Sequence, residues 1–165
     1  MKVSNVVSHN NLWDYEISFD GHYDMLFYLG QSYFKSADIL LNQPFDESYI
    51  HTLIPSLVCY SYAIEYLSCS ILEIENIDYP KTKQVHNIKF LFEKFPTNVQ
   101  KDIISLFNTS NKGQGNNLLK LLDENKSTNS EWRYDFIAQH SNATFLHNYS
   151  TCLMKYLTTR LSKSK

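Results

Sequence analysis

The sequence predicts an all-α protein, an up-and-down bundle of about five helices within one domain. Apolar residues recur at helical spacing along most of the chain, which is the main sequence signal for amphipathic helices. Only 4 Gly and 4 Pro occur in the chain, so a turn-rich all-β architecture is disfavoured. A length of 165 residues suits one domain with one hydrophobic core.

The first helix is expected over residues 22–41. One face carries an apolar stripe and the opposite face carries charged and polar side chains, as in a surface helix with one buried side. Pro44 follows, and proline cannot continue a helix. The stripe consists of Leu26, Leu29, Tyr33, Ala37 and Leu40.

The second helix, over residues 53–76, is apolar nearly all round and should therefore be central. Between Leu53 and Leu72 the only formal charge is Glu65. Because an unpaired buried carboxylate is costly, Glu65 is expected to have a partner. This stretch approaches the length of a membrane span, but Pro55, Glu65 and several Ser and Tyr favour a buried helix over a bilayer one.

Three further helices follow. One is expected over residues 85–94. The next begins at Thr97, where Thr97 and Gln100 have the spacing of a capping box. Residues 118–122 form a short apolar segment, and the last helix is expected over residues 141–161.

These elements divide the chain into three parts: an N-terminal segment at 1–21, one helical domain at 22–162 and a short basic tail at 163–165. Within the first part, residues 12–19 fit either a short strand or an extra helical turn.

Composition and motifs exclude several classes of function. The formal net charge is -2, so no global basic surface holds nucleic acid, and any RNA contact must be local. Phosphate loops, dinucleotide fingerprints, zinc-protease motifs and nucleophile elbows are absent, so no cofactor and no metal are expected. Cys59, Cys69 and Cys152 lack CxxC spacing and are interpreted as reduced, buried thiols. The N-terminus has no signal-peptide pattern, so the expected compartment is the cytoplasm, without a membrane.

One stretch combines residues suited to phosphate chemistry. Six residues separate Arg133 from His140, so on a continuous helix both would lie on one face, about 10 Å apart along the axis. The planar guanidinium can hold phosphate oxygens, and the imidazole can gain or lose a proton near neutral pH. In RNA the 2′-hydroxyl supplies an internal nucleophile, so such a site needs no metal.

Three features together resemble the HEPN domain family of small α-helical proteins. The apolar run around Glu65, from Tyr62 to Leu67, is similar to the family's second-helix signature. The sequence His86-Asn87-Ile88 is similar to the opening of the family's next helix. Arg133 and His140 match the family's Arg-x(4–6)-His motif, placed just before the final long helix.

The resemblance implies a helical bundle that dimerises, with the two Arg-His motifs facing one composite cleft. Active members are metal-independent endoribonucleases that cleave RNA, and many are toxins or antiviral defence effectors paired with a nucleotidyltransferase-like antitoxin. By this resemblance Arg133 binds the scissile phosphate and His140 handles the proton. Glu65 then positions Arg133, and Asp135 gives polar support.

Other interpretations stay open. Tyr134 follows the arginine, where ribonuclease members carry a small polar residue, so a non-catalytic HEPN-like module that binds a nucleotide, RNA or a partner protein is the alternative. A helical interaction domain, with Arg133 buried against Glu65, is the third. His86 is interpreted as a capping or core-edge histidine and His147 as a solvated residue, while the aromatic residues of the first helix are assigned to core and dimer packing.

Overall fold

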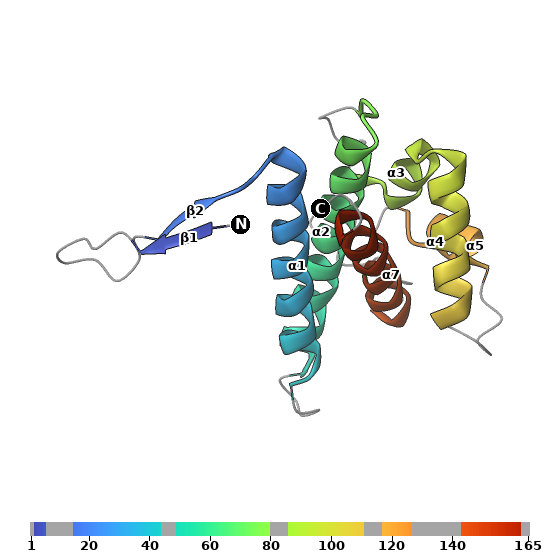
Figure 1. The fold of residues 1–165 in the computed structure, drawn as a ribbon. Helices are drawn as coiled ribbons and strands as arrows, with labels where there is room; N and C mark the ends of the chain where they lie inside the picture. The colour runs from blue at the N-terminus through green and yellow to red at the C-terminus, as the bar shows by residue number, and fades with distance from the viewer. Residues whose placement is uncertain are drawn as a thin grey trace.

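The structure is a computed structural model that describes residues 2–5, 15–43, 49–79, 86–110, 117–126 and 143–162. These ranges contain six helices and one small hairpin (Figure 1). The helices supply nearly all of the hydrophobic core within these ranges, which confirms the all-α class. The described helices outnumber the five expected by one, because the short apolar segment at 118–122 is itself helical.

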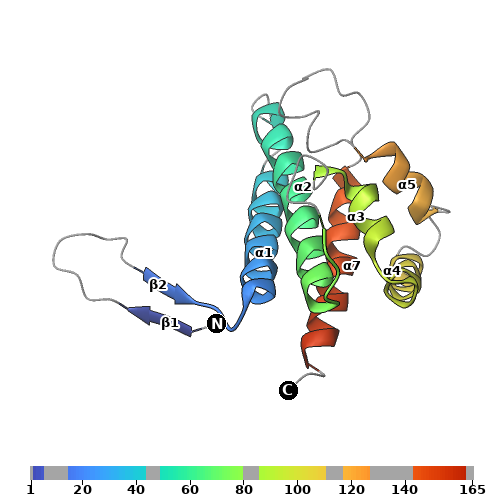
Figure 2. The ribbon, with the colours of Figure 1, turned by 90° about the horizontal axis from the view of Figure 1, so that it is seen from above.

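The hairpin answers the question left open for residues 12–19. Strand β2 (Tyr15–Ser18) pairs antiparallel with β1 (Lys2–Asn5), with Val3 opposite Ile17. The hairpin extends away from the helices in both views (Figures 1 and 2). The short element near residue 17 is therefore a strand.

Helices α1 (His22–Leu41) and α2 (Tyr49–Ile74) lie antiparallel, side by side (Figure 1). The bounds of α1 are those predicted. Helix α2 starts four residues before the expected Leu53, and Pro55 lies inside it, as in the predicted helix. Pro55 is exposed, which keeps its ring away from the packed side of the helix.

The C-terminal end of α2 is set by Asn76, which has a positive φ of 55°. The Ile77 amide donates to the Leu72 carbonyl at 2.9 Å, a bond that closes the helix end around this left-handed residue. Helix α2 therefore stops at Ile74 and does not reach residue 76.

Helix α2 is the central element, since it packs against α1, α3 and α7. It is long and apolar enough to cross a membrane by length and composition, but 67% of its most apolar window is buried inside the bundle. This burial is what is expected of α2 as the core helix of a folded domain. Its fully buried residues include Ala63, Ile64, Leu67, Ile71 and Leu72.

Helices α1 and α2 approach each other closely at Gly30. A Cβ atom built on Gly30 would lie 2.7 Å from the Cγ of Leu67, closer than carbon atoms pack. Leu67 is itself 0% exposed, so its side chain has no solvent to move into. Glycine at this position therefore permits the contact between the two helices.

Of the remaining helices, α3 and α7 pack against α2, α4 packs against α7 and α5, and α5 also packs against α3 (Figure 2). Asn87 caps α3, because its side chain accepts from the Phe90 amide at 2.9 Å, and α3 therefore starts later than the predicted residue 85. Helix α4 starts at Thr97 as predicted, and the Gln100 side chain donates to the Phe95 carbonyl at 2.8 Å, at the C-terminal end of α3. The bounds are α3 (Ile88–Lys94), α4 (Thr97–Ser110), α5 (Leu118–Glu124) and α7 (Ala143–Ser162).

Candidate functional site

Of the four predicted site residues, the structure describes Glu65. Arg133, Asp135 and His140 lie outside the described residues. The predicted ion pair between Glu65 and Arg133 therefore stays a prediction. Helix α7 begins at Ala143, three residues after His140.

Glu65 lies on the central helix and is 8% exposed. Its Oε2 lies 2.9 Å from Nδ1 of His86, which directly precedes the cap of α3. The expectation that this carboxylate needs a partner is confirmed, and one partner is His86. A carboxylate has two oxygens with several acceptor sites, so this contact is compatible with a further arginine at the same group.

His86 occupies the edge of the core, with its side chain 30% exposed. This agrees with the core-edge interpretation, whereas the capping role belongs to Asn87. The motif resemblance marked Glu65 and His86 separately. Their contact was not predicted, because they belong to different elements and only the fold brings them together.

The Glu65 carboxylate affects the groups around it. Burial, together with the charge of Glu65, raises the pKa of the Cys69 thiol to about 12. Burial and the neighbouring Tyr33 and Glu65 also raise the pKa of Tyr66. Neither group is ionised near neutral pH, so neither supplies a nucleophile here.

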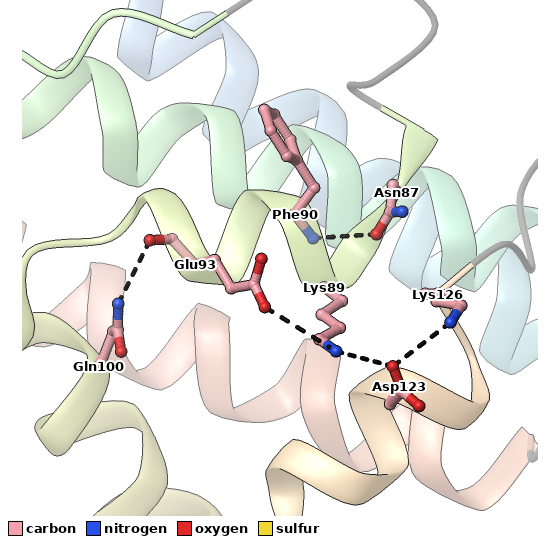
Figure 3. Close-up of polar contacts among 7 residues, drawn as sticks. All are labelled: Asn87, Lys89, Phe90, Glu93, Gln100, Asp123 and Lys126. Atoms are coloured by element: carbon pink, nitrogen blue, oxygen red, sulfur yellow. Dashed lines mark hydrogen bonds and ion pairs between the residues drawn. The ribbon is translucent and has the colours of Figure 1, made fainter.

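A polar cluster connects α3, the helix that follows His86, to α5 (Figure 3). Lys89 Nζ lies 2.7 Å from Oδ1 of Asp123, and Lys126 Nζ lies 3.4 Å from the same oxygen. Hydrogen bonds from the two lysines hold the pKa of Asp123 below its ordinary value, and the bond to Asp123 raises that of Lys89. Lys126 is therefore engaged within the fold.

The second polar cluster lies at the junction of α1, α2 and α7. The Tyr60 hydroxyl donates to Asp38 Oδ1 at 2.5 Å, and His147 Nε2 lies 3.7 Å from the same oxygen. The His147 ring packs near the rings of Phe34 and Tyr60. The His147 side chain is 41% exposed, which agrees with the interpretation of His147 as a solvated residue, whereas its contacts with α1 and α2 were not predicted from the sequence.

The aromatic residues of α1 serve mainly in packing. Tyr33 stacks on Tyr62 and Tyr66, with ring centroids 5.1 and 5.5 Å apart, and Phe34 packs edge-on to Tyr60. The half-buried tyrosines therefore use their ring faces on one another, as the packing interpretation predicts.

The thiols agree with the sequence interpretation in part. All three cysteines are free; Cys69 and Cys152 are buried, while Cys59 is half-buried. Within the described ranges, no three His, Cys, Asp or Glu side chains group together as metal ligands.

A cavity of about 390 Å³ lies between α4 and α7, away from Glu65. Its lining combines Arg160, which pairs with Glu75 at 3.3 Å, with hydroxyl groups and apolar side chains. No sequence motif indicated it. The residues that line it are Asn98, Asp102, Ser105, Leu106, Tyr156, Thr159 and Arg160.

Replacing His86 by alanine is expected to lower the free energy of unfolding by about 1–3 kcal/mol at pH 7, because the buried Glu65 loses this donor. Urea unfolding monitored by circular dichroism measures the change. In a Glu65→Gln background the same substitution should cost clearly less, since no charge then depends on the imidazole. An equal cost in both backgrounds would show that the contact does not stabilise the fold.

The chain matches no model of a known family, no curated protein and no solved structure.

Proposed function

We propose that this chain is a HEPN-like domain and a metal-independent endoribonuclease of a cytoplasmic toxin–antitoxin or antiviral defence system. The observation that carries the proposal is the 2.9 Å contact between Glu65 and His86. These two residues come from the two motif elements that resemble consecutive helices of the family, and they meet where the start of α3 approaches the central helix α2. The start of α7 at Ala143 also leaves the Arg133-to-His140 stretch directly before the last described helix, as the resemblance implies.

The chemistry follows from the residue types. The RNA 2′-hydroxyl attacks the adjacent phosphorus while His140 takes its proton, and the P–O5′ bond breaks. The 5′-oxygen leaves with a proton from a protonated histidine, and the products are a 2′,3′-cyclic phosphate and a 5′-hydroxyl end. Arg133 stabilises the charge that develops on the phosphate oxygens. Glu65 orients Arg133, and Asp135 supports the site.

The proposed assembly is a homodimer in which two Arg-His motifs face one cleft, so that one histidine can act as base and the partner's as acid. A nucleotidyltransferase-like protein is the proposed antitoxin. The buried position of Glu65 supports its proposed role in orienting Arg133, because a carboxylate held in the core is a fixed acceptor for an arginine.

The test is cleavage of end-labelled mixed-sequence RNA by the purified full-length chain in EDTA. Wild-type protein should yield fragments ending in 2′,3′-cyclic phosphate, and the same RNA made with 2′-O-methyl groups should stay intact. The Arg133→Ala/His140→Ala double variant is the control for a contaminating nuclease. Fragments of the same pattern from the double variant would refute the proposal.

Tyr134 favours a second candidate, the non-catalytic module, because active members carry a small polar residue after the arginine. In that case the wild-type protein binds RNA or a nucleotide but does not cleave RNA. The Arg133→Ala variant should lose this binding, whereas the His140→Ala variant should keep it. Fluorescence anisotropy with labelled RNA and labelled nucleotide separates these outcomes.

A further inference from the structure

The cavity between α4 and α7 is lined by one face of each helix. On α4 the lining residues Asn98, Asp102 and Ser105 lie four and three positions apart, so they share a face. On α7 the lining residues three and four positions after Tyr156 share the face of that tyrosine. The volume of about 390 Å³ falls within the range of sites that hold small molecules. Glu65, the described residue of the proposed RNA site, is not part of this lining.

Two formal charges belong to the described lining, and one of them is already paired. Arg160 Nε lies 3.3 Å from Oε1 of Glu75, which comes directly after α2. The other charge is the carboxylate of Asp102, an exposed residue. Lys101, the residue before it, lines a neighbouring hollow and not this cavity. The lining therefore presents one negative charge beyond the pair of Arg160 with Glu75.

A hydroxyl group of the lining favours a ligand that donates hydrogen bonds. The Thr159 hydroxyl donates its proton to the Lys155 carbonyl at 2.9 Å, so its oxygen can serve a ligand only as an acceptor. An ammonium group has three N–H donors and no acceptor, which matches a carboxylate and a hydroxyl oxygen of this kind. A ligand carboxylate has acceptors alone, and it would be repelled by the charge of Asp102.

Tyr156 and Leu106 supply the apolar part of the lining. Tyr156 is 9% exposed, and Leu106 packs against the hydrophobic core. Burial and the charges of Glu75 and Asp102 raise the pKa of Tyr156, while Arg160 opposes this shift. The phenol is therefore neutral near pH 7 and lies within electrostatic reach of Asp102. An aromatic ring near a carboxylate suits an organic cation, because the ring face attracts positive charge.

We infer that this cavity binds a small organic amine. The ammonium group binds the Asp102 carboxylate and the Thr159 hydroxyl oxygen. The apolar body of the ligand lies against Tyr156 and Leu106. Because the charge of Arg160 is offset by its carboxylate partner, it repels the ammonium group only weakly.

The test is an NMR titration of the isotope-labelled full chain near neutral pH with three probes of similar shape. These are phenethylamine, which is a cation, phenethyl alcohol, which is uncharged, and hydrocinnamate, which is an anion. Phenethylamine at millimolar concentration should shift the amide signals of α4 and α7 around the cavity. The other two probes should bind at least about tenfold more weakly, the lower end of what a hydrogen bond to a charged group contributes. The absence of these shifts, or equal or tighter binding of the alcohol or of hydrocinnamate, would overturn the inference.

Three variants locate the binding site. Asp102→Asn keeps the size of the side chain but removes its charge, so the affinity for phenethylamine should fall about tenfold. Asp78→Asn is the matched control, because Asp78 is an exposed carboxylate outside the cavity lining and its loss changes the net charge equally. Ser105→Phe places a bulky ring in the cavity and should abolish binding.

Asp102 and Ser105 are exposed on α4, so both variants are expected to fold, and urea midpoints check this. Wild-type affinity of Asp102→Asn for phenethylamine would refute the inference. An equal loss of affinity in Asp78→Asn would also refute it, since the effect would then come from net charge and not from this site.

Discussion

Alanine at His140 should lower the rate of RNA cleavage by at least about 100-fold, the smaller end of what a positioned acid or base contributes. Arg133→Ala should cost about as much, since it removes the charge opposite the developing phosphate anion. Arg133→Lys keeps the charge but loses the planar fork, so an intermediate rate is expected. Initial rates in EDTA measure all three variants.

The matched control is the His9→Ala variant, which replaces a histidine of the N-terminal segment. This variant should cleave RNA at the wild-type rate. Urea midpoints establish that each variant is folded. Full activity of His140→Ala beside an inactive Arg133→Ala would leave the arginine as a phosphate contact and assign proton transfer to another group. Full activity of both the His140→Ala and the Arg133→Ala variant would show that these two residues are not part of the active site.

Truncating Leu67 to alanine should lower the free energy of unfolding by about 2–5 kcal/mol, the range for emptying a closed core site. Leu67 is 0% exposed and packs against Gly30, where the two long helices approach each other closely. The loss should appear in urea or thermal unfolding. Ile39→Ala is the matched control, because Ile39 is 65% exposed on α1 and should cost little.

Gly30→Ala tests the same contact from the other helix. In the wild type the new methyl group collides with Leu67, and the strain should exceed the roughly 1 kcal/mol that alanine gains over glycine in a helix. In the Leu67→Ala protein the collision is gone, so the same change should become neutral or stabilising. Equal effects of Gly30→Ala in both backgrounds would show that the two residues do not interact.

The sequence was informative where the signal is local. The bounds of α1 follow from its apolar stripe and the proline beyond it, and the central place of α2 follows from its apolar surface on all sides. Helix α2 starts four residues before the predicted Leu53, and it accommodates an exposed Pro55. The end of α2 depends on the backbone of Asn76, which no periodicity shows.

The site was predictable only in part, for a related reason. That Glu65 needs a partner follows from its place in an apolar helix, but which residue meets it depends on how α3 approaches α2. The contacts of Asp38 with Tyr60 and His147 join three helices, and no spacing along the chain reveals them. The Arg133, Asp135 and His140 assignments rest on the motif resemblance and await the assays above.

The central position of α2 also bears on how the chain is made. Helices α1 and α2 are neighbours in the sequence and can form a helical hairpin while synthesis continues, since local contacts form fastest. The side of α2 that α7 covers stays open until residues 143–162 have left the ribosome. During that interval the nascent chain presents a long apolar helix to the cell, which makes it a client for chaperones that bind exposed hydrophobic segments.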